Sequence, residues 1–329
     1  MTNKIKISSL QIGILTFFLS QVAFFPVVSP ILFKMSKQAI WLSVIIGFLI
    51  GLLIIKLFLY IQNKKQHMTI FEYSTYKLGN IIGNIVNILL CLAVLFMITL
   101  IFSKFCIFLN VNLIPDVPIL ALELYMLLVA IYAVNKGFET ISRTSQILAL
   151  LSVLLFIIGF SLLIYYINID NIKPILESSI SNIFKSSIVY SFSSVIPVFL
   201  LLTIPKTEVT NVKNYNKSVI FWYICSSIMT FIILLITILV LGNNLTIIFE
   251  YPEYIALKQI QFFHFVERLE NFISIIWLFN VFVFITLGIY FIDEFLKFRF
   301  KINDRKNKFI LGLLVVIILL LSNIILYIK

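Results

Sequence analysis

Polar residues interrupt two of the long apolar stretches in this chain, and their chemical types suit them to binding a small solute. The first stretch, 9–33, contains Ser20 and Gln21 followed by two prolines, and the sixth, 188–204, contains a serine-rich segment followed by a proline. Bilayer hydrocarbon offers no partner to a freed backbone N–H or C=O, so non-helical backbone persists there only inside protein or beside a cavity. Two such breaks, five stretches apart, are expected where discontinuous helices build a site near the membrane midplane.

The polar residues of these breaks are the first candidates for ligand contacts. An unwound segment at 20–23 would expose backbone donors and acceptors, and the half-helix that follows would point its positive end at an anion such as a carboxylate. The segment 190–194 would do the equivalent from the opposite side. Alternatively, proline and serine only kink two continuous helices, and neighbours satisfy the freed groups. The candidate ligand-binding residues are Ser20, Gln21, Val22, Ala23, Lys104, Tyr190, Ser191, Ser193, Ser194 and Asn280.

A charge inside an apolar stretch costs at least about 2.5–3.5 kcal/mol. Lys56 lies close enough to the cytoplasmic end of its stretch to extend to the interface, whereas Lys104 and Glu123 need another explanation. Lys104 lies below the outer end of the third stretch, and Glu123 lies at a similar depth in the fourth. The connection between them is short, so an ion pair between the two is geometrically possible. The alternatives are that each side chain reaches the membrane interface separately, or that Lys104 contacts the ligand.

The composition is that of an integral membrane protein. Hydrophobic residues make up 61% of the chain and charged residues 12%, and the mean hydropathy is +1.11, whereas a soluble domain carries about a quarter charged residues. The polar stretches are too short for a separate core, so 1–329 is expected to form one polytopic all-α transmembrane domain. The nine expected spans are 9–33, 38–61, 82–109, 117–134, 145–167, 188–204, 218–241, 271–296 and 309–328.

The distribution of Lys and Arg predicts the orientation. With the N-terminus inside, basic residues are concentrated in the cytoplasmic loops, as the positive-inside rule requires. The largest group lies between the eighth and ninth stretches: Lys297, Arg299, Lys301, Arg305, Lys306 and Lys308. The net charge of +11 therefore indicates attraction to anionic lipid headgroups and not to nucleic acid.

Enzyme chemistry and metal binding find no support in the residue spacing. Cys91, Cys106 and Cys225 lie within apolar stretches and lack ligand spacing, and His67 and His264 are expected on opposite sides of the membrane. No carboxylate pair, triad or phosphate-binding loop occurs at a useful spacing. The sequence predicts no enzyme, no cofactor and no metal.

Two further patterns concern packing. Gly47 and Gly51 are separated by one helical turn, which allows close approach of another helix within the bundle. The segment 253–270 alternates apolar and polar residues and is expected to lie as an amphipathic cap on the outer surface.

Several different short motifs follow one another along the chain. The most specific is the cytoplasmic 132–139 with Arg143, and the strongest external one is 265–270 with Trp277. The others are Ile7-Ser8 with Gln11, Trp41-Leu42-Ser43, Thr69-Ile70-Phe71-Glu72 with Gly79 and Gly83, Leu113-Ile114-Pro115-Asp116-Val117-Pro118, and Tyr251-Pro252. Together they resemble the spore germination permease family, the B subunits of nutrient germinant receptors in endospore-forming bacteria, over nearly the whole chain.

The resemblance implies a LeuT-like inverted-repeat helix bundle of the APC superfamily, in which spans one and six are the broken helices that line a germinant pocket. It also places Lys104 where relatives tend to carry a basic residue. The chain departs from the family at three points. Phe192-Ser193-Ser194 lacks the acid that relatives carry in span six, Phe284 stands near the position of a lysine in span eight, and nine spans are expected where the family has ten.

The function implied is that of a membrane subunit in a spore germinant receptor, in the spore inner membrane, together with the A and C subunits. It would bind a small nutrient, such as an amino acid, and trigger germination. One alternative is a secondary transporter of amino acids and cations in the same superfamily. A third is a scaffolding subunit without its own ligand.

Overall fold

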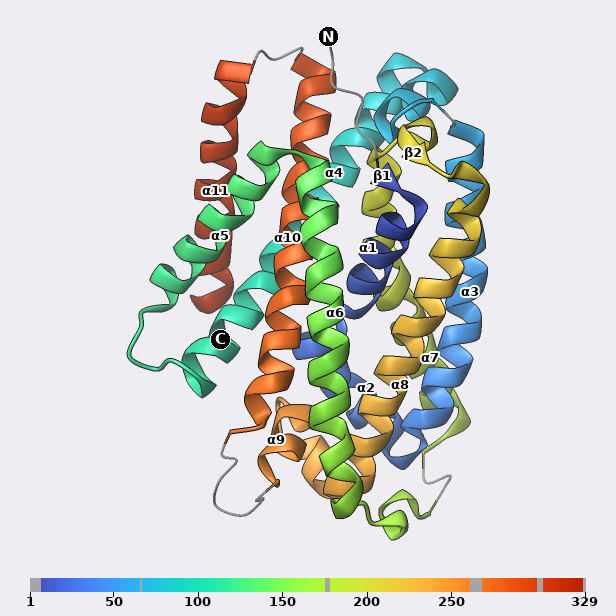
Figure 1. Ribbon diagram of the computed structural model, residues 1–329, viewed down its shortest axis with the longest axis vertical. Helices are drawn as coiled ribbons and strands as arrows, with labels where there is room; N and C mark the ends of the chain where they lie inside the picture. Colours follow the sequence, from blue (N-terminus) through green and yellow to red (C-terminus); the bar gives the residue numbers. More distant parts are fainter. Residues whose placement is uncertain (1–6, 66, 175–177, 261–267, 301–303, 328–329) are drawn as a thin grey trace.

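The computed structural model describes residues 7–65, 67–174, 178–260, 268–300 and 304–327, and helices dominate it (Figure 1). The α-helices are α1 (Ser9–Gln21), α2 (Ser29–Ser36), α3 (Ile40–Lys65), α4 (Ile70–Asn112), α5 (Ile119–Lys136), α6 (Phe138–Leu163), α7 (Ile180–Val195), α8 (Tyr215–Ile248), α9 (Pro252–Lys258), α10 (Glu270–Phe300) and α11 (Asp304–Tyr327). Two-residue strands β1 (Ile7–Ser8) and β2 (Val209–Thr210) pair in parallel.

Seven helical stretches in the described part of the chain are long and apolar enough to cross a membrane. They are Ser29–Lys65, Ile70–Asn112, Ile119–Lys136, Phe138–Tyr166, Ile180–Thr203, Val212–Ile248 and Glu270–Phe300. Two shorter apolar helices, Ser9–Gln21 and Leu311–Ile325, accompany them. The predicted all-α membrane class is confirmed, and the count of nine spans stays a prediction.

The first apolar stretch is interrupted as expected, at its centre. α1 ends at Gln21, a turn occupies 22–23, and a π-helix, η1 (Phe24–Val28), leads into α2. The Val28 N–H donates to the Ala23 carbonyl at 3.1 Å, five residues back. Pro26 lacks an N–H and cannot maintain the ordinary helical ladder, so the backbone changes its hydrogen-bond spacing here.

The sixth stretch changes helix type later than the sequence suggested. Residues 190–194 are α-helical, and the change to a 3₁₀ helix, η5 (Ile196–Thr203), follows Val195. Pro197 lies in the first turn of η5, where its missing N–H costs nothing. The serine-rich segment is therefore not unwound.

The helices of the two halves of the chain pair in the same way. α1 packs along α8 and α7 packs along α3, while α5 packs on α10 and α11 packs on α4. α4 and α10 contact each other between the halves. This repeat of pairings is the one expected of an inverted repeat, although the assignment to the LeuT-like class stays a prediction.

The strand pair defines the directions of the broken spans. β1 precedes α1 and β2 follows η5, so α1 starts and η5 ends at the same end of the bundle, which lies at the top of Figure 1. We call this the strand end and the opposite end, where α9 lies, the α9 end. Ser8 caps α1 in a capping box with Gln11, and the Gln11 side chain donates to Gln146 of α6 at 3.1 Å.

The two glycines of α3 lie in tight contact with α7 and α8, which confirms their predicted packing role. A Cβ on Gly47 would lie 2.7 Å from the Ser187 carbonyl oxygen and 2.8 Å from the Tyr190 ring. A Cβ on Gly51 would lie 1.9 Å from the Tyr223 hydroxyl. The absence of side chains at these two positions lets the tyrosines fill the interior.

We expect Gly47→Ala to destabilise the protein, because the added methyl group meets backbone that cannot move independently. Overpacking of this kind costs about 1–3 kcal/mol. The matched control is Gly312→Ala in α11, where an added Cβ has nothing within 4 Å. Thermal unfolding of the detergent-purified protein measures both, and an unchanged midpoint for Gly47→Ala would contradict the packing described above.

Candidate functional site

A stripe of span one faces α10 and defines the centre of the candidate site. Gln21, Phe25 and Ser29 recur at a spacing of four residues. The Phe25 ring stacks on Trp277 of α10, with ring centroids 5.3 Å apart and an interplanar angle of 12°. α1 and α10 run in opposite directions, so Gln21 and Asn280, each about one turn from the stacked rings toward the strand end, lie at the same depth.

The side chains of Gln21 and Asn280, which we call the amide pair, are buried without hydrogen-bond partners. Their exposed fractions are 1% and 2%, and none of their four polar atoms has a partner among the described residues. The neighbouring Ser20 hydroxyl is also unpaired. A buried polar atom without a partner costs about 1–3 kcal/mol, so such a group calls for an explanation, and a ligand is one.

The amide pair offers both kinds of hydrogen-bonding chemistry. A primary amide carries two N–H donors and a carbonyl acceptor. Two of them at one depth can therefore donate to a carboxylate and accept from an ammonium or hydroxyl group without any fixed charge.

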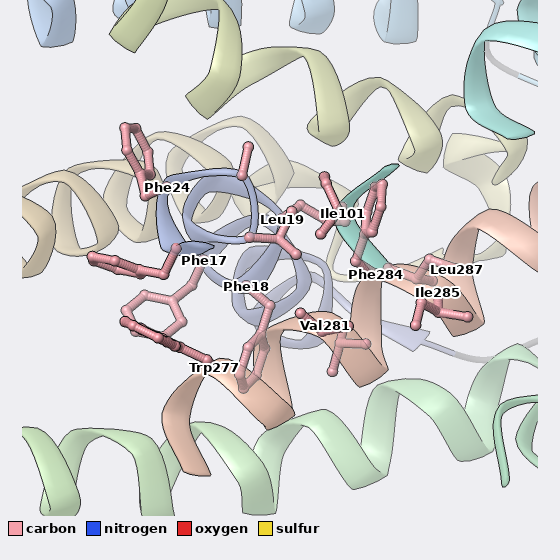
Figure 2. Close-up of a cluster of buried hydrophobic side chains, with 14 of the residues drawn as sticks. Phe17, Phe18, Leu19, Phe24, Ile101, Trp277, Val281, Phe284, Ile285 and Leu287 are labelled. Atoms are coloured by element: carbon pink, nitrogen blue, oxygen red, sulfur yellow. The ribbon is translucent and has the colours of Figure 1, made fainter. Parts of the chain in front are cut away.

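Aromatic rings lie on the α9 side of the amide pair, and we call them the aromatic layer. Phe108 of α4 packs at centroid distances of 4.7 Å from Trp277, 4.9 Å from Tyr251 and 5.4 Å from Tyr254, and Phe25 stacks on Trp277. Figure 2 shows Phe17 and Phe18 of α1 beside Trp277 and Val281 of α10; these two α1 rings precede Gln21 and lie on the strand-end side of the amide pair. The aromatic layer itself extends from Trp277 through Phe108 to Tyr254 of α9.

Tyr190 of α7 is one of the residues through which the two broken spans contact each other. It is fully buried, and its ring lies 4.7 Å from that of Phe24 in η1. The Tyr190 hydroxyl lies beside Ser227 of α8, although no bond of good geometry forms. The predicted residue Tyr190 thus reaches span one.

The serines of span six bond carbonyl groups of their own helix, and Ser194 also bonds the Tyr223 hydroxyl of α8 at 3.2 Å. Ser191 donates to the Ile188 carbonyl at 2.9 Å, Ser194 donates to the Ser191 carbonyl at 3.0 Å, and Ser193 bonds the Val189 carbonyl. Such bonds back to the preceding turn bend a helix and satisfy the hydroxyl. These three hydroxyls are therefore weaker ligand candidates than the amide pair.

The remaining candidate residues lie in two different places: one is in the core, and two line an apolar cavity. Val22 is buried in the core. Ala23 and Ser193 line a cavity of about 430 Å³ between η1, α4 and α7. The walls of that cavity are almost purely apolar, and ligand contact by these two residues stays a prediction.

The ion pair between Lys104 and Glu123, one of the possibilities that the sequence left open, does not form. Glu123 is fully buried and accepts a hydrogen bond from Ser322 of α11. Lys104 is half-buried, and no ion pair joins these two described residues. The carboxyl group faces α11, a neighbour that sequence reasoning had not assigned to it.

A buried acid lies beyond the aromatic layer. Glu253 of α9 is 1% exposed, although the expected amphipathic cap 253–270 had no role for a buried acid; 261–267 of that cap lie outside the described residues. Burial raises the pKa of Glu253 to about 7, while the Ser29 hydroxyl and its own backbone N–H oppose this shift. Ser29 is the last member of the span-one stripe, so the stripe connects the amide pair to α9.

Sequence reasoning missed Ser29, Trp277 and Glu253 as parts of this site. The four-residue spacing of Gln21, Phe25 and Ser29 was the available signal, because it places the three on one face of span one. Within the described residues, no cluster of three or more His, Cys, Asp or Glu side chains could hold a metal.

These features define a polytopic all-α membrane protein with a buried polar site beside a broken helix. The family model described as "Spore germination protein" matches residues 6–327. The chain belongs to this family, which confirms the resemblance drawn from its motifs.

Individual relatives from Bacillus subtilis (strain 168) agree with this assignment. Spore germination protein KB is 26% identical over 263 residues, covering 78% of this chain and 69% of the relative. Spore germination protein A2 is 25% identical over 285 residues, covering 84% and 75%. The putative spore germination protein YfkT is 26% identical over 280 residues, covering 84% and 76%.

We expect Asn280→Leu to stabilise the ligand-free protein, because it removes two unpaired polar atoms from the interior at nearly constant volume. The expected gain is about 1–3 kcal/mol. The control is Asn87→Leu, since Asn87 accepts from Ser74 at 2.6 Å and donates to the Phe71 carbonyl at 3.1 Å. Thermal midpoints should move in opposite directions, and a loss of stability in Asn280→Leu equal to that of the control would argue against an unpaired amide.

Glu253 predicts a pH dependence of stability. The folded-state pKa of about 7 lies above that of an exposed glutamate, so the folded protein binds this proton more tightly than the unfolded chain does. The resulting stabilisation is complete at low pH and is lost as the pH rises from about 4.5 through about 7. Unfolding midpoints across that range should fall in the wild type and remain flatter in Glu253→Gln; parallel curves would count against a buried, titrating Glu253.

Proposed function

We propose that this chain is the nutrient-sensing membrane subunit of a spore germinant receptor and that it binds a small nutrient, an amino acid, at the amide pair. The observation that carries the proposal is the set of buried, unpaired polar atoms of Gln21 and Asn280. Membership of the spore germination protein family supports a role in germination. The chain would reside in the spore inner membrane with its N-terminus in the cytoplasm and assemble with the A and C subunits of the receptor.

The chemistry of the site favours a ligand with both donors and acceptors. The amide pair and the Ser20 hydroxyl supply neutral hydrogen-bonding groups, and the end of α1 adds backbone groups at the turn 22–23. A zwitterionic amino acid satisfies donors with its carboxylate and acceptors with its ammonium group. The aromatic layer would exclude water, which strengthens each of these hydrogen bonds.

Both broken spans are attached to each other at the strand end, which gives a route from the site to the cytoplasmic loops. Thr210 donates to the Ile7 carbonyl at 3.2 Å in the strand pair. The Ile204 carbonyl, just after η5, accepts from Gln62 at 2.9 Å and from Lys65 at 2.8 Å. A ligand that favours one arrangement of span one would therefore shift the segment after span six, provided that it binds the two states unequally.

A second candidate function, secondary transport of an amino acid, draws support from the broken first span and the repeated helix pairing. Proteoliposomes that contain only this chain distinguish the two. Saturable uptake of labelled amino acid would favour the transporter, and binding without uptake would favour the receptor.

We expect Gln21→Ala to raise the nutrient concentration for half-maximal germination by about tenfold, which corresponds to the loss of about 1.4 kcal/mol of binding free energy. Thr237→Val is the control, because its buried hydroxyl bonds only the Ile233 carbonyl of its own helix at 2.7 Å. Germination of spores is followed as the loss of optical density over a nutrient series. A Gln21→Ala response identical to wild type, at equal protein level, would favour the scaffolding alternative.

A further inference from the structure

The beginning of α4 turns sharply, and a polar cleft lies beside the turn at the strand end. Gly79 has a φ of 79°, so α4 consists of two helical pieces, 70–78 and 80–112; a positive φ of this kind favours glycine. A Cβ on Gly83 would lie 2.6 Å from the Thr75 Cα, so the first piece packs closely on the start of the second. The cleft has a volume of about 770 Å³, and its walls include Thr75, Asn80, Asn84, Phe298 and Arg299. We call it the polar cleft.

Arg299 of α10 gives the polar cleft a positive charge. The neighbouring Lys297 is neutralised within α10, since it pairs with Asp293 at 2.7 Å and with Glu294 at 3.0 Å. Arg299 forms no ion pair with another side chain that the structure describes. Its guanidinium group is therefore free to bind an anion.

The remaining charges around the polar cleft do not cancel that of Arg299. Glu72 and Tyr76 line an adjoining cavity. The Glu72 carboxylate accepts a hydrogen bond from the Thr69 N–H at 2.7 Å in the capping box of α4, whereas the Lys77 ammonium lies 5.3 Å from the centre of the Tyr76 ring. The acid thus has a partner at the helix start, and a second cation lies nearby.

The polar cleft offers hydrogen-bond donors that suit phosphate oxygens. A guanidinium group binds a phosphate through two parallel N–H donors. Asn80 and Asn84 add side-chain amides, of which the Asn84 amide donates to the Asn80 carbonyl at 2.6 Å. A primary amide has two N–H donors, so this bond leaves the second donor of Asn84 available.

An apolar crevice continues the polar cleft along the same faces of two helices. It has a volume of about 350 Å³ and lies between α4, α10 and α11, of which α10 and α11 run side by side in Figure 1. On α4, Asn84 of the cleft is followed by Ile88 and Leu92 of the crevice at intervals of four residues, which places them on one face. On α10, Arg299 is preceded on one face by Leu296 and Ile292. We call this cavity the apolar crevice.

The change from polar to apolar walls coincides with the expected edge of the membrane. Asn80 and Arg299 lie just outside the expected spans 82–109 and 271–296, whereas the crevice residues lie within them. Ile88 and Leu92 of α4 are 47% and 55% exposed, and Leu313 of α11 is 48% exposed, so the crevice opens to the surroundings of the bundle. An apolar cavity does not hold ordered water, and the hydrocarbon of the bilayer is what its walls would meet.

We propose that the polar cleft and the apolar crevice together bind one anionic glycerophospholipid, with its phosphate at Arg299 and an acyl chain in the crevice. The pairing of a cation with a phosphate at the interface contributes electrostatic attraction, and burial of the chain removes apolar surface on both sides from looser contacts. A soluble anion would leave the crevice unfilled. A lipid without net charge would leave the charge of Arg299 uncompensated.

A further helix of the repeat would pack elsewhere on α4. In the first half α6 packs along α1 and α10, whose counterparts in the pairing described above are α7 and α4. A helix in the corresponding position would therefore contact the side of α4 that faces α7, where Met97 lies. Ile88 and Leu92 lie on the opposite face of α4, so the apolar crevice is a separate feature.

Native mass spectrometry of the full-length, detergent-purified protein tests the proposal. The probes are dioleoylphosphatidylglycerol, dioleoylphosphatidylcholine with the same acyl chains, and soluble glycerol phosphate. We expect the phosphatidylglycerol to bind about fivefold more tightly than the phosphatidylcholine, which is the factor that one cation beside an anionic headgroup contributes. Glycerol phosphate should not displace the bound lipid at equal concentration.

Variants of the arginine test the headgroup contact. Arg299→Gln should abolish the preference for phosphatidylglycerol, and Arg299→Lys should keep most of it. The matched control is Arg143→Gln of α6, which removes an equally charged side chain that is 70% exposed, and it should retain the wild-type preference.

A phosphatidylglycerol with a diazirine in its acyl chain tests the crevice. Photolabelling should fall on 88–95 of α4 or 313–317 of α11. Leu92→Trp fills the crevice and should weaken binding of both lipids about fourfold for each methylene group displaced, whereas Leu128→Trp of α5, at a position 58% exposed, should not. Thermal midpoints identify folded variants, and Leu313→Trp on the facing wall replaces Leu92→Trp if the latter does not fold.

Each contrary outcome overturns the proposal. Equal affinities for the two lipids in the wild type, or a preference that survives Arg299→Gln, would show that Arg299 does not bind the headgroup. Displacement of the lipid by glycerol phosphate would indicate a site for free anions, and labelling confined to other segments would show that the crevice holds no acyl chain. No nutrient is needed, so these results are independent of the proposed ligand site.

Discussion

The structure depends on one constraint, that backbone freed from a helix within a membrane must find its partners in the protein. Span one meets it with a π-helix, which keeps the Val28–Ala23 hydrogen bond across the break, and with complete burial of the turn at its centre. Span six meets it with a 3₁₀ segment, and the Ile204 carbonyl that directly follows this segment accepts hydrogen bonds from Gln62 and Lys65. The tyrosines that pack against the α3 glycines help to enclose these two irregular segments, since Tyr190 contacts Phe24 of η1 and Tyr223 contacts Ser194 just before η5.

The burial of these irregular segments explains why unpaired polar groups are concentrated beside the break in span one. Helices that only pack against each other need no unpaired amide, and an unpaired amide in the interior is costly. Gln21 is the last residue of α1, where span one leaves its regular helix, and Asn280 belongs to α10, which contacts α1. Ser29 and the Glu253 carboxyl form a second group of buried polar atoms on the α9 side of the aromatic layer.

Sequence patterns predicted the parts of this arrangement that depend on local chemistry. Proline and polar residues located the break in span one, the glycine spacing located the tight packing of α3, and ordered motifs gave the family. What failed depended on which neighbour a side chain faces. Glu123 was matched with Lys104 because their connection is short, but it faces Ser322, nearly two hundred residues later. Ser193 was grouped with Ser191 by proximity, yet Ser193 lines an apolar cavity whereas Ser191 is fully buried. Periodicity gives the face of a helix, and only the packing of all the helices decides what that face meets.

The strand pair has a consequence for the order in which the chain assembles. Ile7 and Thr210, joined by a hydrogen bond, are 203 residues apart in the sequence, so the pair cannot form until five later membrane segments have been synthesised. During that time span one lies in the bilayer with its irregular centre uncovered by α7, α8 or α10. Biogenesis therefore includes a long interval in which the first segment lacks its final neighbours, so that its place in the membrane depends on the early helices or on the insertion machinery.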